Sequence, residues 1–185
     1  METFRKSVID MIPVVLGILI ALFINNWQEG LKNQRFLRSV FSSISQEIAD
    51  NLEELDQIIP LQEAVIDSLE VHLNDDQLSA GEVIIAADGF KLPTIKNAAW
   101  RSFLNTKIEL IDYELISILS EIEEAKAFMQ IKTSKLMDFI FSAIDNNTAE
   151  SKQILMMHIL NVIDSEEQIQ EMHHEFLSLD LDFGQ

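Results

Sequence analysis

One uninterrupted apolar stretch lies near the start of the chain. Met11 to Ile24 reads MIPVVLGILIALFI and carries no charged residue. A helix of fourteen residues spans about 21 Å, which is short of the roughly 30 Å of a bilayer's hydrocarbon core. Extended to residues 8–27, the helix reaches about 30 Å and can span that core. Asp10, Asn25 and Asn26 then lie near its two ends, where polar groups cost least.

Two other interpretations of this stretch compete with a membrane span. A cleaved signal peptide needs small residues after the apolar run, whereas this run ends in bulky Phe23 and Ile24. A buried core helix often has this length, but this one is apolar on every face. We therefore expect residues 1–30 to form an N-terminal membrane anchor and residues 31–185 to form an acidic, soluble helical bundle.

The anchor carries candidate contacts between membrane helices. Gly17 and Ala21 form a small-xxx-small pair, a pattern typical of close helix packing. Asp10 and the Asn25–Asn26 pair are polar groups at membrane depth, which often mark an ion pathway or an oligomer contact. In a ring of several chains they would form an acidic girdle and a polar ring at the mouths of a pore. Simple placement at the lipid interface is the alternative.

Beyond the anchor, apolar residues keep three- and four-residue steps, which predicts a long amphipathic helix. Gly30 is a candidate hinge, and Pro60 is expected to kink or split the helix. Gln62 interrupts the apolar stripe, and the residues between its members include Glu47, Asp50, Glu53 and Glu54. The stripe consists of Leu37, Phe41, Ile44, Ile48, Leu52, Leu55, Ile59, Ile66, Leu69 and Leu73.

The stretch from Asn74 to Leu110 is less regular and contains several turn signals. Residues 83–87 fit either a short strand or a helical turn. Pro93 and Thr94 are expected to precede a short helix that carries Trp100 and Phe103.

Two further long helices are predicted. One begins near Asp112, and Asp145 to Asn147 ends it. Asn147 is the expected N-cap of the last helix, with Glu150 completing a capping box. The predicted fold is therefore all-α: an N-terminal transmembrane helix followed by an antiparallel bundle of long helices. Intermolecular coiled coils are the alternative use of these stripes, and a homo-oligomer is expected.

Charge and composition narrow the range of partners. The net charge of −18 repels nucleic acid, and the absence of Cys excludes disulfides and thiolate metal sites. Trp27, Lys32, Arg35 and Arg38 follow the apolar run and are expected to anchor it at the lipid interface. Basic residues are nearly balanced across the run, so they decide orientation weakly; we prefer a periplasmic soluble domain.

Candidate catalytic and metal-binding groups are sparse. Glu171-x-x-His174 resembles half of a di-metal carboxylate motif, but no second Glu-x-x-His occurs in the chain. His173, His174 and Glu175 are expected to form a solvated C-terminal turn. The Glu47–Glu54 carboxylates are expected to be a solvated face. No nucleotide-binding or hydrolase motif is present, so we expect no enzyme activity and no cofactor.

Two stretches resemble a known family. Residues 14–29, VVLGILIALFINNWQE, resemble the V-x-G-I-x-I-A-L-x-I-N-N-W-x-E opening of an uncharacterised bacterial family common in Bacteroidetes. Residues 94–100 and 110–115 are similar to its middle. The resemblance implies a single-pass membrane protein, here of a bacterial inner membrane, and it supplies no catalytic residue.

These observations predict a non-enzymatic, membrane-anchored protein that self-associates. It would act as a scaffold or sensor and present an acidic soluble domain to a protein partner. An oligomeric, channel-like assembly with the N-terminal helices lining a pore is the alternative.

Overall fold

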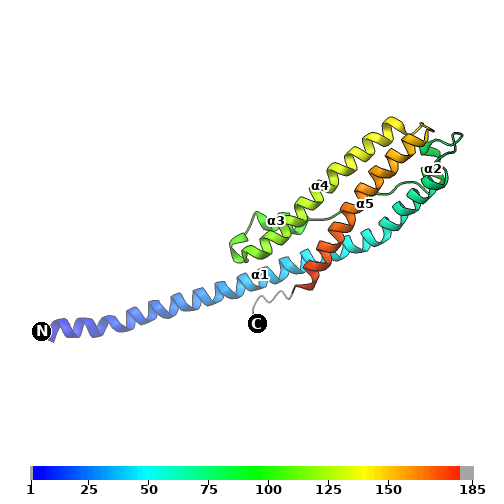
Figure 1. Ribbon diagram of the computed structural model, residues 1–185. Coiled ribbons are helices and arrows are strands. Elements are labelled where there is room, and N and C mark those ends of the chain that lie inside the picture. The colour runs from blue at the N-terminus through cyan, green and yellow to red at the C-terminus, as the bar shows by residue number, and fades with distance from the viewer. Residues whose placement is uncertain (1, 180–185) are drawn as a thin grey trace. The chain divides into compact units, whose positions relative to one another are not determined.

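The protein is all-α in a computed structural model that describes the backbone of residues 2–179 and the side chains of residues 11–179 (Figure 1). No strand occurs among these residues. The helices are α1 (Glu2–Val71), α2 (Ala80–Ala86), α3 (Ala98–Leu104), the 3-10 helix η1 (Ile108–Leu110), α4 (Tyr113–Ala143) and α5 (Ala149–Ser178). Residues 83–87 are therefore a helical turn at the end of α2, and the alternative of a strand is wrong.

Helix α1 runs through both positions that were expected to interrupt it. Gly30 and Pro60 lie within its 70 residues, so the helix has neither a break at Gly30 nor a split at Pro60. Pro60 is exposed, while its neighbours Ile59 and Gln62 are buried. The proline ring thus faces solvent, and buried neighbours on both sides hold the helix where one backbone hydrogen bond is missing.

The chain divides into two compact units, with the division between Ser42 and Ser43. We call them the N-terminal unit and the core unit. The expected division between residues 30 and 31 differs from this boundary, and as the limit of a membrane anchor it stays a prediction.

In the core unit, α4 and α5 form an antiparallel pair (Figure 1). The later part of α1, from Ser43, and α2 contribute further apolar side chains to the same core. Members of that core on the three long helices include Leu55, Ile59, Leu69, Met129, Leu136, Leu155, Ile159, Val162 and Ile169. Because three long helices share one apolar core, the all-α prediction of a helical bundle is confirmed.

The helix ends of the core unit follow capping rules, with one correction. Ser79 and Glu82 form a capping box at the start of α2. The predicted box at Asn147 is wrong, because Thr148 is the N-cap of α5 and accepts a hydrogen bond from the Ser151 amide. The Asn147 side chain instead donates to the carbonyl of Asp76, which ties two loops together.

The short helix and the second long helix begin where they were expected. Helix α3 follows Pro93 and Thr94 and buries Trp100 and Phe103. Asp112 is the residue that precedes α4.

Candidate functional site

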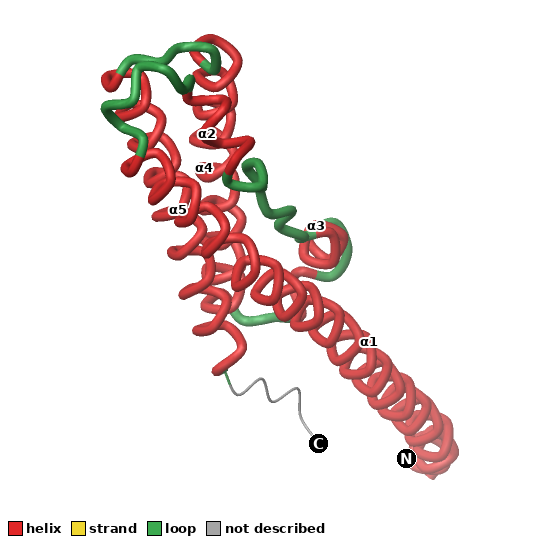
Figure 2. The backbone as a smooth tube through the Cα atoms, turned by 90° about the vertical axis from the view of Figure 1, so that its right-hand side faces the viewer, coloured by secondary structure: helices red, strands yellow, loops and turns green. Residues whose placement is uncertain are grey.

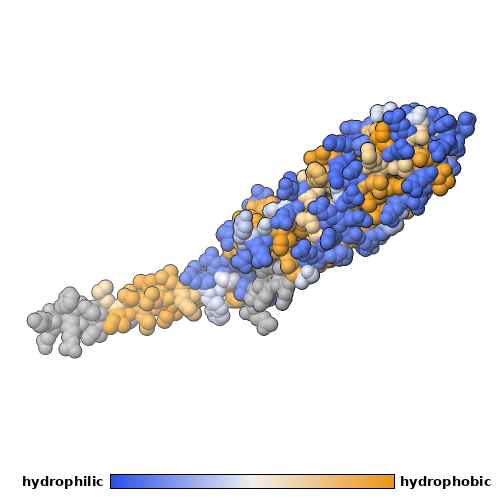
Figure 3. Space-filling view, viewed as in Figure 1, coloured by the Kyte–Doolittle hydropathy of each residue, from blue (hydrophilic) through white to orange (hydrophobic). Residues whose placement is uncertain are grey.

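The apolar segment of α1 is exposed on every side. From Met11 to Trp27 each residue is exposed, and Figure 3 shows the apolar side chains on its visible face. An 18-residue window in this helix has a mean hydropathy of 1.7, with none of it buried. By length and composition, α1 is therefore a candidate membrane span.

The residues expected to make membrane or oligomer contacts lie along this exposed segment. Gly17, Ala21 and Asn25 stand four residues apart, so they follow one another along one side of α1. A side chain added at Gly17 would meet nothing within 4 Å. Asn26 is exposed as well. Asp10 belongs to α1, but its side chain lies outside the described residues.

The expected interfacial residues are also at the surface. Trp27 is 62% exposed, and Lys32, Arg35 and Arg38 are exposed. Whether these residues meet lipid stays a prediction.

In the core unit, an extended segment lies between α2 and α3, and we call residues 89–97 the strap (Figure 2). Asp88 and Gly89 take positive φ values, 69° and 84°, and turn the chain into it. An extended segment outside a sheet leaves its backbone N–H and C=O groups in need of partners. Side chains of α1 supply partners for four of these groups.

Three α1 side chains hold the strap by its backbone. Asn51 accepts from the Lys96 amide (2.8 Å) and donates to the Lys96 carbonyl (2.9 Å). Glu54 accepts from the Thr94 amide (2.7 Å), and Gln62 donates to the Lys91 carbonyl (3.0 Å). Because residue numbers rise on α1 as they fall on the strap, the two run antiparallel.

Three carboxylates of the expected solvated face, those of Glu47, Asp50 and Glu54, are half-buried and bind neighbouring groups. Glu47 accepts from the Ala99 amide (3.0 Å) at the start of α3, and Glu54 holds the strap. Asp50 pairs with the Lys96 ammonium (2.9 Å). The hydrogen bond from Lys96 is the main cause that lowers the pKa of Asp50. Glu53 is exposed and accepts a hydrogen bond from Gln57.

Helix α5 places a histidine against this arrangement. His173 is 1% exposed, so its expected position in a solvated turn is wrong, although His174 and Glu175 are exposed. Asn51 Nδ2 lies 3.1 Å from His173 Nε2. Because Nδ2 is a donor, Nε2 accepts and the ring proton of the neutral imidazole is on Nδ1. Burial lowers the pKa of His173 to about 4, which keeps the ring neutral.

Two turns earlier on α5, Glu166 meets the second strap-binding amide. Gln62 Nε2 donates to Glu166 Oε1 (3.1 Å), and both side chains are fully buried. Burial raises the pKa of Glu166 to about 7. The same pattern thus occurs twice: an amide on α1 binds a strap carbonyl with one hydrogen and an ionisable group on α5 with the other.

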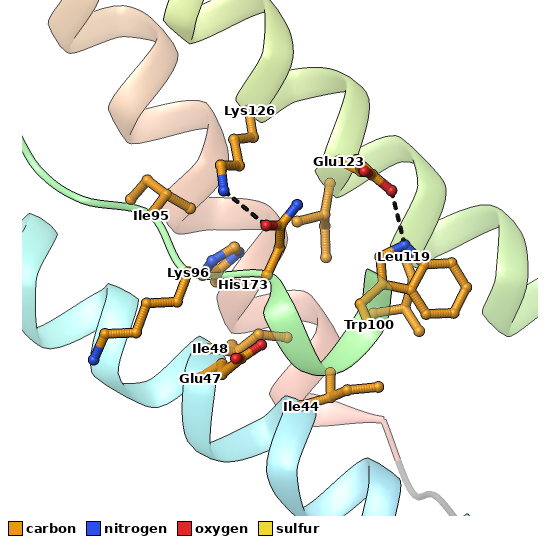
Figure 4. Close-up of a pocket in the computed structure, with 12 residues that line it drawn as sticks. Ile44, Glu47, Ile48, Ile95, Lys96, Trp100, Leu119, Glu123, Lys126 and His173 are labelled. Atoms are coloured by element: carbon orange, nitrogen blue, oxygen red, sulfur yellow. Dashed lines mark hydrogen bonds between the residues drawn. The ribbon is translucent and has the colours of Figure 1, made fainter. Parts of the chain in front are cut away.

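A cavity of about 20 Å³ lies beside His173 (Figure 4). Its lining includes Lys126, which donates to Asn97 (2.9 Å), and Trp100, which donates to Glu123 (3.2 Å). The volume suits about one water molecule, whereas small-molecule pockets are about 300 Å³ or larger. Nor does any group of three His, Asp or Glu residues in the described part of the chain suit a metal ion.

A buried cation holds the end of α1. Lys152 in the first turn of α5 is fully buried, and its ammonium donates to the carbonyls of His72 (2.8 Å) and Asp75 (2.7 Å). These carbonyls lie in the turn after α1, where helical partners run out.

The apolar stripes assign no roles to the buried polar residues, although the register of these residues carries a signal. Asn51 is three residues from Ile48 and four from Leu55, and Glu166 is three from Ile169. Polar residues at core positions of a helical stripe need partners inside the protein. The stripe alone does not say which partners those are.

Comparison with known proteins places the chain in a family. The model of a family of unknown function, DUF6090, matches residues 10–106, which include the apolar segment, the strap and all of α3. No curated protein and no solved structure matches the chain. The bacterial origin implied by the resemblance stays a prediction. Because the match covers more than half of its residues, the chain belongs to DUF6090, a family of unknown function.

Proposed function

We propose that this protein is a single-pass membrane anchor joined to an acidic helical sensor or scaffold that self-associates and binds a protein partner. The observation that carries the proposal is the apolar segment of α1, exposed on all sides with none of its window buried. Such a surface is costly in water and stable in lipid. The membrane is proposed to be a bacterial inner membrane, with the core unit in the periplasm.

The charge of the chain supports a partner other than nucleic acid. The net charge is −18, and no Lys or Arg occurs between Arg38 and Lys91. An acidic surface repels nucleic acid and anionic lipid headgroups. A protein partner with a basic surface would complement it.

Self-association is proposed through the side of α1 that carries Gly17, Ala21 and Asn25. Small residues let two helix backbones approach closely, and an amide can hydrogen-bond between helices in lipid. Nothing lies within 4 Å of a side chain placed at Gly17, so this side is open to a second helix.

Membrane extraction tests the anchor. The full chain should stay in the membrane pellet after alkaline carbonate and enter solution with detergent. A chain that begins at Leu31 should be soluble, and circular dichroism should show that it remains helical. Release of the full chain by carbonate alone would overturn the proposed anchor. A reporter fused after Gln185 decides the orientation.

Size in detergent tests self-association. Light scattering should give an oligomer for the full chain and a smaller species for Gly17→Ile with Ala21→Ile. The matched control, Leu16→Ile, changes an apolar residue on another side of the helix and should keep the oligomer. A monomeric full chain would overturn the oligomeric scaffold and the channel-like alternative together.

A further inference from the structure

The pair formed by Gln62 and Glu166 has two polar atoms left over. Gln62 Nε2 uses both of its hydrogens, one on the Lys91 carbonyl and one on Glu166 Oε1. Among the described residues, Gln62 Oε1 and Glu166 Oε2 have no hydrogen-bond partner, and both are buried. Leaving such atoms unpaired costs free energy, so the arrangement needs an explanation.

These two atoms complement each other only when Glu166 carries a proton. An ionised carboxylate only accepts hydrogen bonds, whereas a carboxylic acid has one O–H donor. With the proton on Oε2, this oxygen can donate to Gln62 Oε1 while Glu166 Oε1 accepts from Gln62 Nε2. The result is a closed ring of two hydrogen bonds. The terminal torsions of Glu and Gln are broad, so each side chain can rotate to close it.

No neighbouring charge replaces the proton. Neutral Gln62 faces Glu166 from α1, and the strap contributes the Lys91 carbonyl. The Lys91 ammonium is instead 3.8 Å from Asp88, at an exposed position. Burial is the main cause that raises the pKa of Glu166, and no charged side chain in the described part of α1, α4, α5 or the strap contributes to that shift.

We propose that Gln62 and Glu166 form a proton-binding site in the core unit, and that its occupancy sets how firmly the strap is held on α1. Loss of the proton leaves a buried carboxylate with a single hydrogen bond, which only water can then stabilise. The Gln62 amide that binds Glu166 also binds the strap, so admitting water loosens the Lys91 contact. The inference rests on the proposed function in treating the strap as the moving part of a sensor.

Hydrogen exchange of the full chain in detergent tests this site. Peptides that cover residues 89–97 are followed by mass spectrometry between pH 6 and pH 8.5, with rates corrected for intrinsic exchange. Protection of the strap should fall on the order of tenfold across this range, because one proton controls the opening. Protection of α4 peptides should change little.

Two variants separate the proton site from general instability. Glu166→Gln supplies an amide that donates and accepts in the same ring without titrating, so strap protection should stay high and flat. Glu167→Gln changes the exposed neighbour and should keep the wild-type fall. Equal falls in wild type and Glu166→Gln, or no fall in wild type, would overturn the proposal.

A third variant decides the question should Glu166→Gln fail to fold. Gln62→Leu removes the acceptor of the proton and the donor to Lys91, so strap protection should already be low at pH 6. Wild-type protection at pH 6 in this variant would also overturn the proposal. Membrane extraction reports on the apolar segment of α1, whereas hydrogen exchange reports on the strap, so failure of the anchor and failure of the proton site are distinguishable.

Discussion

Two parts of the same helix use apolar residues in opposite ways. Residues 11–27 of α1 are exposed on every side, whereas residues 43–71 bury one face in the core unit. The amides make the contrast plain, since Asn25 is exposed and Asn51 is 1% exposed with three hydrogen bonds. An asparagine in a helix therefore takes its role from the surroundings of its face and not from local sequence.

The largest expected effect comes from substitutions in residues 11–27 of α1. Leu16→Arg with Leu19→Arg places two charges in the middle of the apolar segment, each costing about 3 kcal/mol in a membrane helix. The protein should leave the carbonate-resistant membrane pellet. Gln57→Arg, at an exposed position in the second part, should stay in the pellet. Retention of the double variant would contradict a membrane span.

The asparagines compare the two parts directly. Asn51→Leu removes both hydrogen bonds to the Lys96 backbone, and it should lower the free energy of unfolding of the core unit by about 3 kcal/mol. Urea titration in detergent, followed by circular dichroism, measures the loss. Asn25→Leu is the matched control and should leave that free energy unchanged. Equal losses of unfolding free energy in the two variants would show that the Asn51 hydrogen bonds do not stabilise the core unit.

The turn after α1 provides a second test of a buried polar contact in the core unit. Lys152→Met keeps a long apolar side chain but leaves the His72 and Asp75 carbonyls without their donor. The expected loss in the free energy of unfolding is about 2 kcal/mol, measured by the same titration. Lys135→Met, at an exposed position, should change it by less than about 0.5 kcal/mol. A silent Lys152→Met variant would show that the ammonium does not hold this turn.

Two glycines, one in each unit, should differ in how they tolerate an added methyl group. A Cβ at Gly81 would lie 2.5 Å from Ile144 Cγ1 and 3.0 Å from its carbonyl oxygen, so Gly81→Ala should cost about 1–2 kcal/mol. Gly30→Ala meets nothing within 4 Å and should gain helix propensity at no packing cost. Thermal melts of the two variants should therefore shift in opposite directions or leave Gly30→Ala unchanged. A lower melting temperature for Gly30→Ala alone would contradict this.

The last comparison concerns the pH dependence of stability. The raised pKa of Glu166, about 7, means that the folded state binds this proton more tightly, so its contribution to stability falls as the pH rises from about 4.5 to about 7. The lowered pKa of His173, about 4, has the opposite sign, and its contribution rises from about pH 4 to about pH 6.5. The two slopes oppose each other in the wild-type protein.

Single variants should uncover each slope. Relative to wild type, Glu166→Gln should gain stability with rising pH through this window, and His173→Gln should lose it. Denaturant midpoints at pH 5, 6 and 7 measure the difference, in which the titration of all other groups cancels. Parallel profiles in all three proteins would show that neither group titrates in this way.

Much of the fold was accessible from the spacing of apolar residues. The apolar segment of α1, the all-α class and the starts of α3 and α4 follow from local patterns, because a helix is defined by contacts three and four residues apart. Single residues that usually interrupt a helix were less reliable guides. Gly30 and Pro60 favour breaks, yet tertiary contacts of Ile59 and Gln62 hold α1 together.

The buried polar network could not be predicted in the same way. Asn51 and His173 are 122 residues apart in the chain, and Gln62 and Glu166 are 104 apart. No local pattern pairs such residues. His173 was expected in solvent because two polar residues follow it, whereas its register with Ile169 and Phe176 places it inside. Polar residues that share the register of a core stripe would have been the better guide.

The way α1 holds residues 89–97 has a consequence for how this protein can diverge. Every α1 contact described for Lys91 and Thr94, and the Asn51 contacts to Lys96, end on main-chain atoms, which all amino acids except proline share at the amide. The side chains of Lys91 and Thr94 are exposed, whereas those of Phe90, Leu92 and Ile95 pack in or against the core. Substitutions at Lys91 and Thr94 can therefore change the chemistry of the exposed surface while the main-chain hydrogen bonds keep the segment in place on α1.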